Sequence, residues 1–269
     1  ASEVLKKDRE VELKDYPAVT GKSQASSVYT KDETDKSGFF KYLWGDRYRK
    51  YYSQGIEAPI VDLDTLFGGL TPVRKGGGHQ SKSVRLETKD GKEYVMRAIR
   101  KSATQYIQAV VYKDKYVEGQ FDNTYAESQL LDIYTASHPY APFTIGVLSD
   151  AVGVYHSNPK LYYIPKQNAL KEFNEEFGDE LYMIEERAAS GHGDLASFGN
   201  SNTLISTDDL IKKLRKSGNN YLDQEAFVKA RLFDMLIGDW DRHEDQWRWA
   251  KFEMEDGKNM YRPVPRDRD

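Results

Sequence analysis

The sequence predicts an α+β fold with two lobes. Segments typical of strands dominate the first half of the chain, and helical patterns dominate the later part. A length of 269 residues suits one large domain or two lobes that share a cleft, and a hydrophobic content of 39% is sufficient for a core. We expect a polar arm over residues 1–37, a strand-rich lobe over 38–187 and a helical lobe over 188–269.

Composition and charge exclude several classes of protein. The 39 basic and 43 acidic residues give a net charge of −4, and no basic tract is interleaved with aromatic residues, so we expect no nucleic-acid partner. No apolar run approaches the roughly 20 residues that span a bilayer. Cysteine is absent, which excludes disulfides, thiol nucleophiles and cysteine-ligated zinc.

The first segments of the chain are an arm and an aromatic stretch. Residues 1–37 are polar with little periodicity, so we expect a loosely held arm. Residues 38–55, GFFKYLWGDRYRKYYSQG, are rich in aromatic side chains and predict a helix packed on the main body.

A glycine run and a hairpin follow. The segments SKSVRLET and KEYVMRAI flank Asp90-Gly91, which is a strong signal for a tight turn between two strands. Gly76, Gly77 and Gly78 precede the hairpin, with Gln80 close behind. A glycine backbone can approach a ligand closely and donate N–H groups to phosphate oxygens. A plain hairpin loop without a ligand is the alternative interpretation.

Residues 124–136, TYAESQLLDIYTA, predict a helix with an apolar stripe. Leu130, Leu131 and Tyr134 occupy one face, and Glu127 precedes them by three, four and seven positions. By strand alternation, Arg97 shares a face of the second hairpin strand with Val95 and Ile99. An Arg97–Glu127 ion pair would satisfy both charges, whereas Glu127 would otherwise stay in water at the edge of the stripe.

The later elements have clear boundaries. KLYYIP and ELYMIEER read as strands, and Ser206 or Thr207 caps a helix that begins STDDLIKKL. Asp223 caps the next helix, which Gly238 ends. Residues 247–264 read as a hairpin about Asp256-Gly257. The predicted core stripe of the second helix consists of Phe227, Ala230, Phe233, Leu236 and Ile237.

The segment GDWDRHEDQWRW, residues 238–249, follows that helix and admits three interpretations. If it is extended, Asp239, Asp241, His243 and Asp245 point one way and could hold Mg²⁺, Mn²⁺ or Zn²⁺. A calcium EF-hand is excluded, because Glu244 stands where that loop requires glycine. The segment could also be a solvated loop anchored by its tryptophans. The third interpretation is a catalytic loop, since chemistry is often placed on loops that follow rigid elements.

Phosphoryl transfer requires the residue types found here. One carboxylate orients or deprotonates the attacking hydroxyl group, and amide or carboxylate oxygens hold the metal ion on the phosphates. Asp241 and Gln246 are five residues apart, the same offset as Asp and Asn in the kinase pattern H-R-D-x-x-x-x-N. Asp267 and Asp269 follow the hairpin, so that a second acid could reach the same metal ion.

These motifs resemble those of atypical kinases. GDWDRHEDQW is similar to the G-x-x-D-R-H-x-x-N loop of HipA toxins, lipid kinases and secretory-pathway kinases, and PVPRDRD is similar to the I-P-W-D-x-D segment of CotH-type kinases. The set also resembles a kinase-like domain of larger bacterial envelope proteins. The resemblance covers about residues 38–269 and implies a kinase-like bilobal fold with a reduced helical C-lobe. It favours the bacterial periplasm or envelope and further domains in a longer protein.

The resemblance assigns roles to residues of both lobes. Asp241 would be the catalytic acid or base, with Arg242 and His243 bracing the loop by hydrogen bonds, and Gln246 with Asp269 or Asp267 would hold Mg²⁺ or Mn²⁺. The segment Gly76–Gln80 and Arg97 would contact the phosphates of ATP or another nucleotide, with Glu127 as the partner of Arg97. The backbone near Glu185 and Glu186 would be the hinge that meets a purine.

Three departures from the kinase pattern keep other functions open. Arg97 replaces lysine, Gln246 replaces asparagine, and no glycine follows the metal-binding acid. The chain is therefore expected to transfer phosphoryl to an acceptor or, as a pseudokinase, to bind a nucleotide or an envelope partner without turnover. A metal-dependent hydrolase with His243 as a ligand is a further alternative.

Overall fold

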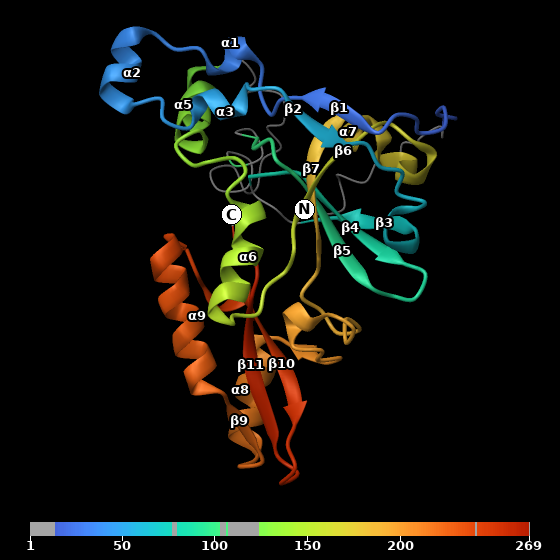
Figure 1. Ribbon diagram of the computed structural model, residues 1–269, viewed down its shortest axis with the longest axis vertical. Coiled ribbons are helices and arrows are strands. Elements are labelled where there is room, and N and C mark those ends of the chain that lie inside the picture. The colour runs from blue at the N-terminus through green and yellow to red at the C-terminus, as the bar shows by residue number, and fades with distance from the viewer. Residues whose placement is uncertain (1–13, 77–79, 103–105, 107–123, 240, 269) are drawn as a thin grey trace, which may run out of the picture. The chain divides into compact units, whose positions relative to one another are not determined.

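The computed structural model describes residues 14–76, 80–102, 106, 124–239 and 241–268, without the side chains of residues 44 and 125–128. The chain forms two compact units (Figure 1). Unit 1 comprises Ala1–Lys89, Val95–Pro139 and Leu161–Ile184, and unit 2 comprises Asp90–Tyr94, Tyr140–Lys160 and Glu185–Asp269. The mixture of sheets and helices confirms the predicted α+β class.

Unit 1 is built on a five-stranded sheet. Its order is β3 (Leu70–Lys75), β4 (Ser83–Thr88), β5 (Glu93–Ala98), β7 (Glu180–Glu186) and β6 (Lys160–Ile164). The predicted hairpin is confirmed as β4 and β5, with Gly91 in the left-handed region at φ 82°. Strand β3 was not expected. It pairs antiparallel with β4, so that the glycine run lies in the loop between two neighbouring strands.

The N-terminal segment of unit 1 is packed where a loosely held arm was expected. Strand β1 (Ser23–Ser26) pairs antiparallel with β2 (Ile56–Pro59), and helix α1 (Lys31–Thr34) follows. Tyr29 is only 2% exposed and stacks on Tyr52 with ring centroids 5.4 Å apart. The prediction was wrong over residues 23–34 because two buried aromatic rings secure a segment whose composition is otherwise polar.

The remaining helices of unit 1 are short. Those with described bounds are α2 (Gly38–Trp44), α3 (Arg49–Tyr52), α5 (Tyr125–Tyr134) and α7 (Asn174–Phe177). The aromatic stretch over residues 38–55 contains two helices in place of one, because α2 ends at Gly45, which has a φ of 77°. Helix α5 is confirmed at its predicted position.

Unit 2 contains a four-stranded sheet of order β8 (Leu204–Ile205), β10 (Trp247–Glu253), β11 (Asn259–Pro265) and β9 (Asn220–Leu222). Strands β10 and β11 form the predicted hairpin about Asp256-Gly257, with Gly257 at φ 77°. Strand β9 runs parallel to β11. Strands β8 and β9 contain two and three residues, too few for an alternating pattern to reveal.

The helices of unit 2 are α6 (Pro142–Val152), α8 (Thr207–Lys216) and α9 (Gln224–Ile237). Side chains of Ser206 and Asp223 cap α8 and α9 as predicted, whereas α6 was not expected. Helix α9, with 14 residues, is the longest in the described part of the chain. None of the helices described there is both long and apolar enough to cross a membrane.

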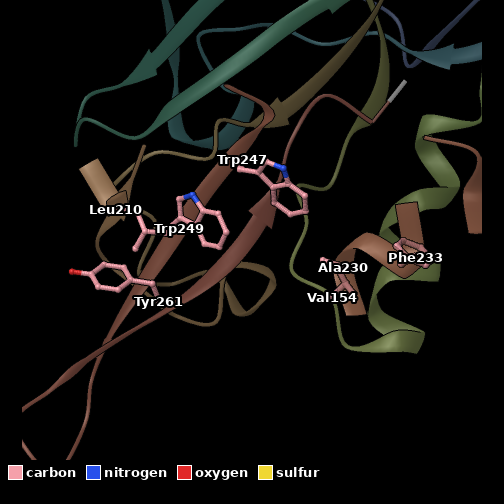
Figure 2. Packing of buried hydrophobic residues seen from close by; sticks show 7 residues of the cluster. All are labelled: Val154, Leu210, Ala230, Phe233, Trp247, Trp249 and Tyr261. Carbon is pink, nitrogen blue, oxygen red and sulfur yellow. The ribbon is translucent and has the colours of Figure 1, made fainter. Parts of the chain in front are cut away.

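The core of unit 2 lies between α9 and the sheet. Figure 2 shows seven of its buried residues, among them Phe233 and Trp247. Four members of the predicted α9 stripe are buried or packed against this cluster, but Leu236 is 79% exposed. Adjacent helical residues point about 100° apart, so Leu236 cannot face the core that its neighbour Ile237 packs against.

Candidate functional site

The loop that follows α9 is the centre of the candidate site. Helix α9 ends at Gly238, whose φ of 78° is favourable only for glycine. The Asp239 N–H then donates to the Asp234 carbonyl oxygen at 2.9 Å. A 3₁₀ turn over Glu244–Gln246 leads directly into β10. Rigid elements of unit 2 therefore hold both ends of the loop.

Arg242 is the main link within the loop, and its side chain is fully buried. Its guanidinium donates to the Asp239 carboxylate, to Asp234 Oδ2 from Nε at 3.3 Å, and to the carbonyl oxygens of Gln246 and Arg266. The guanidinium also lies 5.4 Å from the centre of the Trp247 ring. Arg242 thus joins α9, the loop and the segment after β11.

Asp234 is a buried acid at the centre of this network. Its carboxylate also receives Arg231 Nη1 at 3.0 Å and Arg268 Nη2 at 2.8 Å, and its side chain has no exposed surface. We call Asp234, Asp239, Arg231, Arg242 and Arg268 the arginine cluster; its three cations exceed its two acids. Asp234 was not among the site residues predicted from the sequence, although an acid beside Phe233 in the core stripe was a usable signal.

Burial governs the charges of the arginine cluster. It raises the pKa of Asp239, and the neighbouring Asp234 carboxylate adds to the shift although Arg242 opposes it. Burial also lowers the pKa of Arg268, against the attraction of Asp234. Burial therefore imposes a desolvation cost on the charged forms of these side chains, and the ion pairs within the arginine cluster must offset it.

The backbone of Gln246 is held by hydrogen bonds, whereas its side-chain oxygen has no hydrogen-bond donor among the described residues. Its carbonyl oxygen accepts from Arg242 Nη1 at 3.2 Å and from the Arg266 N–H at 3.0 Å. Its side-chain Oε1 is buried and accepts no hydrogen bond from the described residues. Buried amide oxygens nearly always accept a hydrogen bond, so this oxygen is available to a bound ligand or ion.

The other predicted residues of the loop are exposed. Asp241 and His243 are both exposed, and neither side chain makes a hydrogen bond or ion pair with the described residues. The His243 carbonyl oxygen accepts from the Gln246 N–H at 3.1 Å, so His243 contributes to the loop through its backbone, and Arg242 contributes through its side chain. Asp239 is engaged by Arg242, and no group of three or more His, Asp or Glu side chains in the described part of the chain could hold a metal ion.

Asp267 lies after β11 in a strained backbone conformation. Its φ is 54°, in the left-handed region that residues other than glycine rarely adopt. Its carboxylate pairs with Arg266 Nη2 at 3.2 Å. Strain of this kind is frequent at functional sites. Asp269, the alternative metal-binding acid, lies outside the described residues.

The predicted phosphate loop of unit 1 is described only at its ends. The Gly76 N–H donates to the Ser83 carbonyl oxygen at 2.8 Å, and a Cβ at this position would lie 2.0 Å from Ser83 Oγ, so glycine permits this close approach. The Gln80 carbonyl oxygen accepts from the Ser102 N–H at 2.6 Å. Gly77 and Gly78 lie outside the described residues.

The remaining predictions concern Arg97, Glu127, Glu185 and Glu186. Arg97 is half-buried on the expected face of β5, but the Glu127 side chain lies outside the described residues, so their pairing stays a prediction. The carboxylates of Glu185 and Glu186 accept from Ser157 Oγ and from the Asn158 N–H. The chain passes from unit 1 to unit 2 between residues 184 and 185.

Comparison of the chain with protein-family models, with curated proteins and with solved structures gives no match. A functional assignment therefore depends on the chemistry of the residues themselves. The buried amide oxygen of Gln246, the strained Asp267 and the exposed Asp241 are the features on which it can be built.

Proposed function

We propose that this chain is a kinase-like domain that binds a nucleotide with Mg²⁺ or Mn²⁺ and transfers its terminal phosphoryl group to an acceptor. Unit 2 would correspond to the lobe that carries the catalytic loop and the metal ligands. Unit 1 would correspond to the strand-rich lobe.

The unsatisfied oxygen of Gln246 is the observation that carries the proposal. Gln246 stands at the position that the kinase pattern assigns to a metal-binding amide, and its Oε1 is buried without a hydrogen-bond donor among the described residues. Burying an amide oxygen without a partner costs about 1–3 kcal/mol. A divalent cation would remove that cost, because amide and carboxylate oxygens are the ligands that Mg²⁺ and Mn²⁺ prefer.

Hydrogen bonds link Gln246 to the segment that carries the second predicted metal ligand. Arg242 ties the backbone of the loop to the segment that carries Asp267, so the two sequence regions predicted to supply metal ligands are joined by hydrogen bonds. Gln246 and Asp267, with Asp269 as a further acid, would hold the metal ion. The bound ion would neutralise charge on the phosphates during transfer.

Asp241 is the best candidate for the group that accepts the proton of the acceptor hydroxyl. It is exposed in the same loop, and no described residue pairs with its carboxylate. A carboxylate without an ion-pair partner remains available to a substrate, whereas Asp234 and Asp239 are engaged by arginines. We assign Asp241 to proton acceptance and Arg242 to positioning of the loop.

A thermal-shift titration with ATP and MnCl₂ tests the proposal. Binding raises the melting temperature by mass action, and a ligand at 100 times its dissociation constant stabilises the protein by about 2.7 kcal/mol. We expect stabilisation that requires both ATP and the metal ion. The absence of a shift for every nucleotide would rule out the kinase-like assignment.

Two variants separate binding from transfer. Gln246→Leu should abolish the metal-dependent shift without destabilising the free protein, because the oxygen that it removes has no partner to lose. Gln224→Leu, at an exposed position of the same unit, is its control. Asp241→Asn should keep the shift and lose phosphoryl transfer to water or to an added acceptor, measured with labelled ATP. Binding without transfer by the wild-type protein would instead support the pseudokinase alternative.

A further inference from the structure

A charged pocket lies within unit 1 and is lined by residues of α2, α3 and α5 and of the turn between α2 and α3. Its volume of about 670 Å³ is within the range of about 300–1,000 Å³ typical of small-molecule sites. We call it the α3–α5 pocket. Its lining includes Lys36, Phe40, Tyr48, Arg49, Asp132 and Ile133.

Arg49 is the unusual residue of the α3–α5 pocket. It is only 5% exposed, and neither its Nε nor its Nη1 donates a hydrogen bond to the described residues. Nη1 lies 3.0 Å from Asp132 Oδ1, an ion-pair distance without the alignment of a hydrogen bond. A guanidinium buried with unused N–H groups is costly unless a ligand accepts from them.

The described lining of the pocket has an excess of positive charge, which favours binding of an anion. Asp132 Oδ1 is shared between Arg49 and Lys36, whose Nζ lies 3.1 Å away, so one carboxylate serves two cations. The other charged lining residues, Asp46 and Arg47, cancel each other. The described lining residues therefore carry one more positive than negative charge.

The pocket is held in shape from both sides. Tyr52 Oη donates to the Tyr134 carbonyl oxygen at 2.8 Å, which fixes α3 to the end of α5. The Phe40 ring lies 5.1 Å from the Arg49 guanidinium and 5.3 Å from Lys36 Nζ, so it supports both cations. Arg49 is therefore oriented before any ligand arrives.

We propose that the α3–α5 pocket binds a small organic anion with an apolar or planar body and one phosphate or carboxylate group. The anionic oxygens would accept from the Arg49 guanidinium, whose Nε and Nη1 donate no hydrogen bond to the described residues. Lys36 would add a second positive charge, and Phe40, Tyr48 and Ile133 would contact the body. None of these residues has a role in the proposed kinase-like site, so the inference is independent of it.

Proton–nitrogen NMR of the arginine Nε–Hε groups tests the proposal on the full chain without metal ions. The probes are phenyl phosphate, benzoate and inorganic phosphate, and the Arg49 signal is assigned by its loss in Arg49→Lys. We expect a saturable shift of this signal with phenyl phosphate or benzoate at a dissociation constant below about 1 mM, and at least roughly tenfold weaker binding of inorganic phosphate. No saturable shift with either organic probe would overturn the proposal.

Variants show whether the anion is held at this place. Calorimetry should find binding at least roughly tenfold weaker in Arg49→Lys, because lysine lacks the planar guanidinium group. The same loss is expected in Lys36→Gln. Lys36 is partly exposed, so this variant is less prone to misfold. Lys50→Gln, at the next, exposed position of α3, should bind as the wild type does. Wild-type affinity in both Arg49→Lys and Lys36→Gln would refute the site.

Discussion

Asp234 shows how much one buried carboxylate can organise. It receives three arginines that come from α9, from the loop after it and from the segment after β11. Arg268 also reaches Ser149 on α6 at 3.0 Å. Contacts between elements far apart in the sequence therefore converge on a side chain with no exposed surface.

Replacing Asp234 by Asn should destabilise the protein by about 3 kcal/mol, because buried arginines would lose their main counter-charge. Urea denaturation monitored by circular dichroism measures this change. Asp241→Asn makes the same chemical change in the neighbouring loop at an exposed residue, and it should alter the free energy of unfolding by less than about 0.5 kcal/mol. A loss below about 1 kcal/mol in Asp234→Asn would contradict the central role of this carboxylate.

At the scale of elements, Asp223 joins helix α9 to strand β11. Its Oδ1 accepts from the Ala226 N–H at 3.0 Å, which caps the helix, and its Oδ2 accepts from Arg262 Nε at 2.7 Å. Burial has the largest effect on the pKa of Asp223 and raises it. The Ala226 N–H, Arg262 and the Glu225 N–H together outweigh burial, so the pKa is lowered.

A lowered folded-state pKa makes the contribution of Asp223 dependent on pH. The stabilisation is present above the unfolded-state pKa of about 3.9 and is lost as the pH falls through the folded-state value. Asp223→Asn keeps a capping side chain but loses the charge, so its stability deficit should be constant from about pH 5 to 8 and shrink below about pH 4. Urea titrations across this range measure the deficit.

The exposed Asp208→Asn, in the first turn of α8, is the control for Asp223→Asn. It changes the same functional group without removing an ion pair that joins two elements. A deficit in Asp223→Asn that grew toward low pH would contradict the direction of the shift.

At the scale of the whole molecule, the surface of unit 2 carries an apolar face. Val228, Leu232 and Leu236 of α9 and Val152 of α6 border a hollow of about 590 Å³. Leu232 and Leu236 are 60% and 79% exposed. Contiguous apolar surface of this kind is rare on monomeric soluble proteins outside sites of interaction.

The apolar face should bind the hydrophobic dye ANS in the native state. Leu232→Gln combined with Leu236→Gln should reduce dye fluorescence while changing the free energy of unfolding by less than about 1 kcal/mol, because neither side chain is in the core. Ile211→Gln, on α8 and outside this hollow, should leave the fluorescence unchanged. Equal fluorescence in the double variant would show that the dye binds elsewhere.

The sequence by itself determined the elements whose signals are local. Asp90-Gly91 and Asp256-Gly257 specify tight turns, and Asp223 and Gly238 mark the two ends of α9, because turn and cap chemistry acts within a few residues. The place of Gln246 in the loop after α9 was also predictable, because the motif that contains it is a single contiguous segment.

Only the tertiary structure decided which of these residues are buried and what they contact. Leu236 was expected in the core and is exposed, whereas Asp234 is buried through partners as distant in sequence as Arg268. The packing of Tyr29 and the short strands β8 and β9 likewise depend on segments far along the chain, and so does the ion pair of Arg49 with Asp132. Burial is a property of the folded arrangement, and a pattern read along one segment contains no information about the surface that will cover it.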